Sequence, residues 1–311
     1  MKYYIGIDGG GTKSTCILVD EQKKQLCECK GGPTNFLHIG AEKAAETIFN
    51  LIESCKEKNK VHQNQIESVF IGTTGGGRRV EAQSLEKALR VLAHTKHITY
   101  KNMYVESDAL VALEGAFNGN PGSILIAGTG SIMYGKDSKD RVYRVGGCGR
   151  IIGDEGSAFQ LGRKGLISIA RHLDGRGEST LMTQFLQRDY KIEFQEDLIT
   201  EIYSHNFDIA NFSRTVVHAA EQGDLSALKI VQDEINELIE HIRTMHRKIT
   251  VQNLEVCFIG SLITTENFFS NTLNLRITEE LPDIRLKKAK SSPAFGAVLL
   301  GLKRIYMSQN M

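Results

Sequence analysis

The sequence predicts an α/β protein of two lobes, and three observations lead to this prediction. Runs rich in β-branched and aromatic residues form a three-strand meander near the beginning, after which expected helices and strands alternate. A glycine-rich hairpin occurs twice, around residues 8–12 and around residues 128–130. The chain of 311 residues, 41% of them hydrophobic, is long and apolar enough for two cores.

The first glycine-rich hairpin joins an expected strand at residues 3–7 to a second one at residues 14–19. Its turn is Asp8-Gly9-Gly10-Gly11-Thr12. We expect the glycines to take positive φ angles and to bring their N–H groups close to an anion. A Walker A loop or a Rossmann turn would lead into a helix, whereas these glycines lead into a strand. A plain glycine hairpin with an Asp in its turn is the alternative interpretation.

The rest of the first lobe, residues 1–118, alternates between strands and helices. A third strand of the meander is expected at residues 24–29. A helix over 41–58 follows from its apolar face at helical spacing. The remaining elements are a strand at 68–72, a helix at 82–92, a strand at 102–106 and a helix at 109–117.

The second lobe, residues 119–311, begins with the second glycine-rich hairpin and contains a helical insertion. Its expected elements are strands at 123–126, 131–135, 141–145 and 254–259 and helices at 157–171, 228–249 and 294–305. Small residues in the last helix allow close packing. The helix at 228–249 carries one apolar stripe that is either core or a dimer face, and core is the commoner use of such a stripe. The stripe consists of Val231, Ile235, Leu238, Ile242, Met245 and Ile249.

Composition excludes several classes of protein. A net charge of +1 and a pI near 7.6 give no electrostatic indication of binding to nucleic acid or an anionic membrane. No signal-peptide pattern is present, and no apolar run approaches the ~18–20 residues that span a bilayer. The six cysteines include no C-x-x-C pair, which disfavours zinc and iron–sulfur sites. Cys27 and Cys29 share one strand face and are interpreted as packing. These features predict a reduced, cytoplasmic protein.

Six motifs occur in the order found in one known family. They are DGGGTKS at 8–14, GGPTN at 31–35, ESDA at 106–109, AGTGS at 127–131, GGCGRIIGDEGS at 146–157 and SPAFGAVLLGL at 292–302. The chain therefore resembles the N-acetylglucosamine kinase family, also called the BadF/BadG/BcrA/BcrD ATPase family, of the actin-like ATPase superfamily. This resemblance implies a two-lobed actin-like ATPase (ribonuclease H-like) fold whose cleft closes on a sugar.

Phosphoryl transfer needs phosphates held with Mg²⁺, a positioned acceptor hydroxyl and a carboxylate that takes its proton. The resemblance assigns the magnesium end to Asp8, which would reach the ion through water. It assigns the role of general base to Asp108, which lies where a strand gives way to a helix. An ordinary helix N-cap is the alternative interpretation of Asp108.

The resemblance also implies two sets of ligand contacts. ATP is expected against Gly10, Gly11, Thr12, Lys13, Gly128, Thr129, Gly130, Gly260 and Ser261. The sugar is expected against Asn35, Asp108, Thr129, Gly147, Cys148 and Asp154. A turn followed by an N-cap is the alternative for Asp154. Cys148 stands where many members of the family carry Trp, and its small side chain leaves room for a bulkier sugar.

The expected function is an ATP- and Mg²⁺-dependent amino-sugar kinase, assembled as a homodimer. It would phosphorylate the 6-hydroxyl of N-acetylglucosamine or a close relative, such as N-acetylmuramic acid or glucosamine. One alternative is an ATPase that activates a CoA-dehydratase or reductase. Such activators bridge a [4Fe–4S] cluster with cysteines near the second hairpin, and no cysteine lies between Cys55 and Cys148. The other alternative is a non-enzymatic sugar sensor, which would not need a general base.

Overall fold

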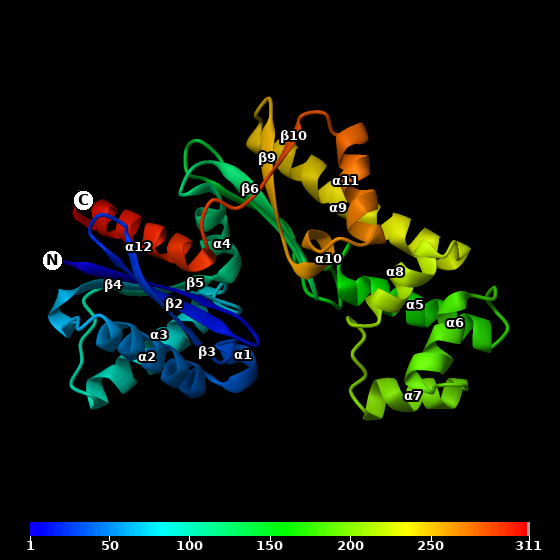
Figure 1. Cartoon of the computed structure of the whole chain (residues 1–311), viewed down its shortest axis with the longest axis horizontal. Helices are drawn as coiled ribbons and strands as arrows, with labels where there is room; N and C mark the ends of the chain where they lie inside the picture. Colours follow the sequence, from blue (N-terminus) through cyan, green and yellow to red (C-terminus); the bar gives the residue numbers. More distant parts are fainter. Residues whose placement is uncertain (310–311) are drawn as a thin grey trace. The chain divides into compact units, whose positions relative to one another are not determined.

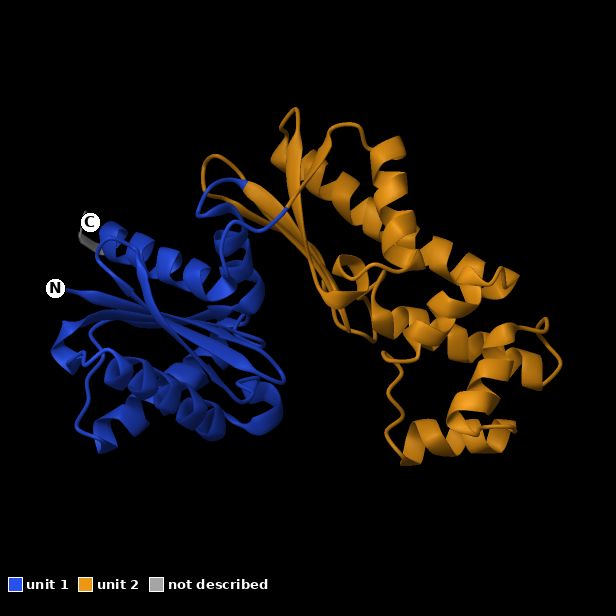
Figure 2. Ribbon diagram, in the orientation of Figure 1, with its two compact units in different colours: residues 1–121, 288–311 blue, residues 122–287 orange. Residues whose placement is uncertain are grey.

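The computed structural model describes residues 1–309, with side chains as far as residue 307. The chain forms two compact units (Figure 2). Unit 1 contains residues 1–121 and the segment from Lys288 onward, and unit 2 contains Gly122–Lys287. The predicted lobes, 1–118 and 119–311, differ from this division in the final segment, which packs with unit 1. Residues 310 and 311 of the predicted second lobe lie outside the described residues.

Unit 1 is built on a five-stranded sheet of order β3-β2-β1-β4-β5. β1 (Tyr3–Gly9) pairs antiparallel with β2 (Ser14–Asp20), which pairs antiparallel with β3 (Gln25–Gly31). β1 also pairs in parallel with β4 (Ile66–Thr73), and β4 pairs in parallel with β5 (Met103–Ser107). The carboxyl ends of β1, β4 and β5 therefore meet at one edge of the sheet, where α/β proteins commonly bind ligands.

Helices cover both faces of this sheet (Figure 1). α2 (Ala41–Lys58) and α3 (Arg79–Thr95) lie on one face, and the short α1 (Phe36–Ile39) precedes α2. α4 (Asp108–Phe117) and α12 (Pro293–Gln309) lie on the other face. A 3₁₀ turn at Gln63–Gln65 leads into β4.

Small residues let α12 approach unit 1 closely, as the sequence predicted. A Cβ added to Gly6 would lie 2.0 Å from the carbonyl oxygen of Ala294. One added to Gly296 would lie 2.0 Å from the carbonyl oxygen of Val111 in α4. Larger side chains at either position would push the elements apart, so this packing explains why the end of the chain belongs with the first sheet.

Unit 2 repeats the same sheet, in the order β10-β9-β6-β7-β8. β6 (Gly122–Ala127), β7 (Ser131–Lys136) and β8 (Val142–Gly146) form the antiparallel meander. β9 (Leu254–Ile259) pairs in parallel with β6, and β10 (Ile284–Lys287) pairs in parallel with β9. The β1–β2 and β6–β7 hairpins thus occupy equivalent places, which confirms the prediction of two related lobes.

The helices of unit 2 form its larger part. They are α5 (Ala158–Leu173), α6 (Leu181–Phe185) with a π-helical turn at Leu186–Tyr190, α7 (Gln195–Ser204), α8 (Ser213–Glu221), α9 (Leu225–Ile249), α10 (Ser261–Thr264) and α11 (Phe268–Glu280). The apolar stripe of α9 is buried in the core of the unit, which confirms the core interpretation. Within residues 1–309, no helix is long and apolar enough to cross a bilayer.

Candidate active site

Two carboxylates come together at the carboxyl edge of the unit 1 sheet. Asp8 lies near the end of β1 and Asp108 directly follows β5, with the end of β4 between these strands. Asp108 accepts a hydrogen bond of 2.7 Å from the Thr74 hydroxyl through Oδ2 and one of 2.8 Å from the Ala109 N–H through Oδ1. Each oxygen keeps a lone pair for a further partner.

The N-cap interpretation of Asp108 is wrong. The residue that caps α4 is Ser107, whose hydroxyl accepts a 3.2 Å hydrogen bond from the N–H of Leu110. Asp108 is the first residue of the helix and is half-buried. Its carboxylate is therefore held in place without being used to cap the helix.

The charge of Asp108 acts on Asp8. Burial and, after it, the negative charge of Asp108 raise the pKa of Asp8 to about 6, and Lys13 opposes the shift. A cation beside Asp8 would offset both the lost hydration and the repulsion. Mg²⁺ binds carboxylate oxygens and keeps several waters, so this half-buried pair at a strand end fits a magnesium site.

Replacing Asp8 with Asn is expected to stabilise the metal-free protein at high pH. The folded-state pKa of about 6 lies above the ordinary 3.8, so ionised Asp8 destabilises the fold, and this cost develops as the pH rises between those values. At pH 8 the variant should gain roughly 1–3 kcal/mol in unfolding free energy, and most of the gain should vanish at pH 4. Denaturant unfolding at both pH values measures it. The exposed carboxylate variant Asp233→Asn is the control, and an equal gain at both pH values would contradict the prediction.

The turn of the first hairpin differs from the expectation in one respect. None of Gly9, Gly10 or Gly11 has a left-handed φ, so the expectation of positive φ angles is wrong. Glycine is required at position 9 for a different reason. The Thr34 side chain approaches the backbone so closely that a Cβ on Gly9 would lie 2.1 Å from its hydroxyl oxygen. The turn closes with a 3.0 Å hydrogen bond from the Gly10 N–H to the Lys13 carbonyl, and its other residues, Gly11, Thr12 and Lys13, are exposed.

A buried cluster of hydroxyl groups fixes the loop that carries Asn35. The Thr34 hydroxyl lies 3.1 Å from that of Ser14 and 3.2 Å from that of Thr73, and the Thr34 N–H donates to the Gly10 carbonyl at 3.0 Å. Asn35 follows directly. Its Oδ1 is buried and has no hydrogen-bond partner in the described part of the chain. A buried acceptor of this kind needs a partner, and a polar ligand is a suitable one.

Thr73 and Thr74 link the two ends of this site, since Thr73 contacts Thr34 and Thr74 donates to Asp108. Neither threonine was predicted from the sequence as a site residue. The available signal was two adjacent polar residues at the end of a buried strand, immediately before a glycine turn.

In unit 2, the second hairpin is tied to the segment that carries Asp154. The Gly128 carbonyl accepts from the Ala158 N–H at 2.8 Å, and the Ser131 hydroxyl donates to the Glu155 carbonyl at 2.5 Å. A Cβ added to Gly130 would lie 2.8 Å from Oδ2 of Asp154. The hairpin and the Asp154 carboxylate are therefore neighbours, and a side chain at Gly130 would displace this carboxylate from its present position.

Asp154 is held in a left-handed backbone conformation with φ of 57°. Its Oδ1 accepts from the Gly149 N–H at 3.2 Å, and burial raises its pKa above the ordinary value. The alternative interpretation, a turn followed by an N-cap, also describes this segment, because Ser157 caps α5. The two interpretations are compatible, since Oδ2 is left facing Gly130 and the hairpin.

A buried glutamate, Glu234, which was not predicted from the sequence, anchors this segment. The Gly156 N–H donates to Oε2 of Glu234 at 2.5 Å, and Lys164 Nζ lies 2.5 Å from Oε1. Glu234 belongs to α9 and is only 1% exposed. No local pattern could reveal it, because the contact joins residues 78 positions apart.

A cleft of about 610 Å³ opens at the carboxyl ends of β6 and β9. Gly128, Thr129 and Ser261, three of the residues predicted to contact ATP, line it. Gly260 lies beside them with φ of 99°, and a Cβ there would lie 2.3 Å from the Ala127 carbonyl oxygen. The volume is within the ~300–1,000 Å³ typical of small-molecule sites, so the cleft fits a nucleotide.

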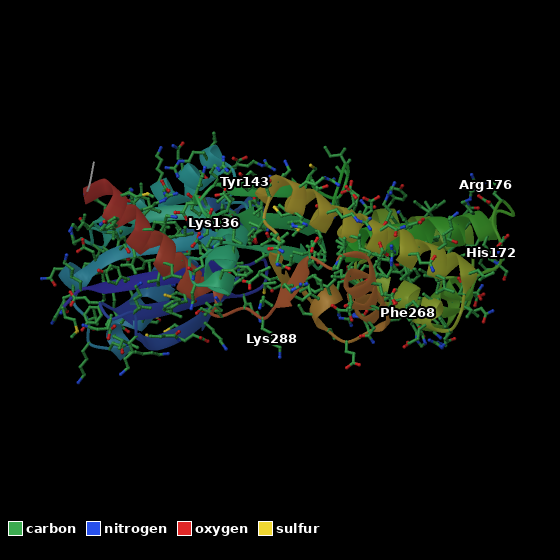
Figure 3. All side chains as sticks on the ribbon, turned by 90° about the horizontal axis from the view of Figure 1, so that it is seen from above. Lys136, Tyr143, His172, Arg176, Phe268 and Lys288 are labelled. Carbon is green, nitrogen blue, oxygen red and sulfur yellow. The ribbon has the colours of Figure 1, made fainter. Side chains whose placement is uncertain are left out.

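The other side of the cleft is formed by α8, the segment before it and the beginning of α11. Phe268, labelled in Figure 3, is the first residue of α11 and lines the cleft. Further lining residues that the sequence analysis missed are Asp208, Asn211, Arg214, His218, Glu221 and Asn267.

The loop that carries Cys148 is tightly folded. Gly147 has φ of 71°, and a Cβ there would lie 2.3 Å from Cδ1 of Ile132. A Cβ added to Gly153 would lie 2.8 Å from that of Cys148. The Cys148 thiol is exposed, and the next residue is the Gly149 that donates to Asp154.

The chain is similar to known proteins along nearly its whole length. An N-acetylmuramic acid/N-acetylglucosamine kinase of Clostridium acetobutylicum is 32% identical over 305 residues, which cover 96% of this chain and 98% of the relative. An N-acetyl-D-glucosamine kinase of Dictyostelium discoideum is 29% identical over 314 residues, covering 96% and 97%.

A solved structure from Chromobacterium violaceum, named as a candidate N-acetylglucosamine kinase, superimposes with a TM-score of 0.76. It is 22% identical, and the match covers 97% of this chain and 99% of that one. This likeness concerns the fold and confirms the predicted α/β architecture. The family model described as BadF/BadG/BcrA/BcrD ATPase family matches residues 5–301. The chain therefore belongs to the BadF/BadG/BcrA/BcrD ATPase family.

Proposed function

We propose that the protein is an ATP-dependent amino-sugar kinase. It transfers the γ-phosphoryl group of ATP to the 6-hydroxyl of N-acetylglucosamine or a close relative. The observation that carries the proposal is the pair Asp8 and Asp108, two carboxylates at the ends of parallel strands with a raised pKa on the first. The named relatives are all kinases of amino sugars.

Asp108 acts as the general base in this proposal. Its Oδ2 is oriented by the Thr74 hydroxyl and its Oδ1 by the Ala109 N–H. As the sugar oxygen bonds to phosphorus, its proton passes to the Asp108 carboxylate, and the bond to ADP breaks. Two fixed hydrogen bonds keep the carboxylate from rotating away from the hydroxyl, which is the positioning contribution to catalysis.

Asp8 holds Mg²⁺ in this proposal, through water. The ion would neutralise charge on the phosphate oxygens. The N–H groups of Gly11, Thr12 and Lys13 then face the phosphates, Gly10 closes the turn beneath them with its own N–H, and the exposed Lys13 ammonium adds positive charge. In unit 2, the cleft beside Gly128, Thr129, Gly260 and Ser261 takes the nucleotide, and Gly130 lets the hairpin lie close to the Asp154 carboxylate.

The sugar is recognised by groups that lack a full set of partners. Asn35 offers its unpartnered Oδ1 to a sugar hydroxyl. Asp154 offers Oδ2 to another, held by Gly149 and by the loop that Glu234 anchors. Gly147 and Cys148 border the same loop. A site built to hydrogen-bond hydroxyl groups discriminates strongly against analogues that lack them.

A homodimer and a cytoplasmic location are also part of the proposal. The α9 stripe is not available as a dimer face, because it is buried within unit 2. Light scattering of the purified chain tests the oligomeric state.

Sugar-dependent release of ADP tests the function. N-acetylglucosamine, N-acetylmuramic acid and glucosamine are compared with 6-deoxy-N-acetylglucosamine, which has no hydroxyl at carbon 6. We expect release with at least one of the first three sugars, a 6-phosphate product by ³¹P NMR, and none with the deoxy sugar. ATP hydrolysis that does not respond to any sugar would contradict the proposal.

A further inference from the structure

Three cysteine thiols converge in unit 1, and none of them is a residue of the candidate active site. Cys27 and Cys29 lie on β3, and Cys55 lies on α2. Their three Sγ atoms are all within 4.8 Å of one another. Cys55 and Cys29 are buried, at 0% and 4% exposed, while Cys27 is partly exposed.

The fold brings these thiols together for simple reasons. Alternate residues of a strand share one face, so Cys27 and Cys29 both point to the face of the sheet that α2 covers. Cys55 is in the last turn of α2, which ends at Lys58, and meets them there. β3 is an edge strand of the sheet, which leaves the Cys27 side of the cluster open to solvent.

We propose that Cys27, Cys29 and Cys55 form a binding site for one thiophilic divalent cation of the Zn²⁺ class. Zn–S bonds of about 2.3 Å in tetrahedral geometry put ligand sulfurs ~3.8 Å apart. The present separations, up to 4.8 Å, need a contraction of about 1 Å, which side-chain rotation supplies. The partly exposed side leaves the fourth position to water.

The charge balance favours a divalent ion over a monovalent one. Three thiolates with a divalent ion carry one net negative charge, and the positive charge of Lys58, which acts on the Cys29 thiol, offsets it. A monovalent ion would leave a second negative charge in a largely buried place, which is costly. Soft thiolate ligands select zinc-type ions over magnesium or calcium.

The groups around the thiols resemble the supporting contacts of metal sites. Asn59 Nδ2 donates to the Cys55 carbonyl at 3.0 Å, and the Cys27 thiol donates to the same carbonyl at 3.7 Å. These contacts fix the end of α2 against β3. A fourth thiol, that of Cys16, lies 3.6 Å behind Cys55 and is fully buried.

Two other uses of the cluster are less consistent with its surroundings. A reactive thiol lies in an electropositive, partly exposed place, whereas Cys29 and Cys55 are both buried. Simple packing is the interpretation that the sequence analysis favoured, on the absence of a C-x-x-C pair. A search for C-x-x-C pairs cannot detect a metal ligand, such as Cys55, that a distant helix supplies.

Titration of the reduced, metal-free full chain with Cd²⁺ tests the proposal, because thiolate–cadmium bonds absorb in the ultraviolet. We expect the charge-transfer band to saturate at one equivalent and Zn²⁺ to remove it by competition. Cys29→Ser should weaken binding by roughly 10²-fold or more, since even supporting residues of metal sites contribute 10–100-fold. Cys29→Ala serves as the second variant if serine disturbs folding, which circular dichroism without metal will show.

Two other cysteines provide matched controls. Cys148 is exposed and Cys257 is a buried thiol outside the cluster. Cys148→Ser and Cys257→Ser should bind Cd²⁺ like wild type. Absence of the band in wild type, or a band that survives both Cys29 variants, would overturn the proposal and leave the cluster as packing. None of these readouts depends on kinase activity.

Discussion

Replacing Asp108 with Asn is expected to lower sugar-dependent turnover by roughly 10²-fold or more, with ATP affinity unchanged. Asn has nearly the shape of Asp and can still accept from the Thr74 hydroxyl or the Ala109 N–H. It cannot take a proton from the sugar hydroxyl. The loss should therefore appear in kcat, because the missing interaction is made only during the reaction.

Steady-state ADP release measures the turnover of the variant, and titration with a fluorescent ATP analogue measures nucleotide binding. Ser107→Ala is a matched control, because it removes the N-cap of α4 beside Asp108 but leaves the carboxylate. It should cost about 1 kcal/mol of stability and leave turnover within a few-fold of wild type. If Asp108→Asn keeps more than about a third of wild-type turnover, Asp108 is not the base.

Local patterns predicted most of the elements well. The helix predicted at 41–58 is α2, with the same bounds, because its apolar residues recur at helical spacing and nothing in tertiary structure opposes them. The strand at 254–259 is β9, again with the same bounds. The strand β10 was missed because it is four residues long and only Ile284 is buried, so no alternating pattern marks it.

Long-range contacts account for the features that the sequence could not reveal. The chain order gives no sign that α12 returns to the first sheet, since this depends on the close approach of Gly6 to Ala294. The same holds within the site. Asp8, Asp108 and Asp154 were found through motifs, whereas Thr74 and Glu234 act through contacts with residues distant in sequence.

The glycines of the first hairpin show a different kind of error. Glycine was expected there for its positive φ, but Gly9 is needed because the Thr34 hydroxyl occupies the place of a side chain. Composition alone cannot separate these two reasons for glycine. The three-cysteine cluster could not be predicted from the sequence either. Only the packing of α2 on β3 makes Cys55 a neighbour of Cys27 and Cys29.

Cys148→Trp is expected to change which sugar the protein accepts. Cys148 is exposed and lies beside Gly149, whose N–H holds Asp154. The interior of the loop has no room for an indole ring. Gly153 packs so closely against Cys148 that even a Cβ on Gly153 would lie 2.8 Å from the Cys148 Cβ. The ring must project from the loop next to the proposed sugar contact, where a small thiol now leaves space.

A bulky substituent on the sugar should meet that ring. Overpacking costs ~1–3 kcal/mol, which corresponds to roughly 5- to 150-fold in discrimination. We expect wild type to accept both N-acetylglucosamine and N-acetylmuramic acid, which carries a bulky lactyl group. In the Trp variant, kcat/KM for N-acetylmuramic acid should fall by that factor. Cys148→Ser, which is matched in size to the thiol, should keep both activities. If wild type ignores N-acetylmuramic acid, or the Trp variant slows both sugars equally, Cys148 does not set specificity, and its side chain matters only to the packing of the loop.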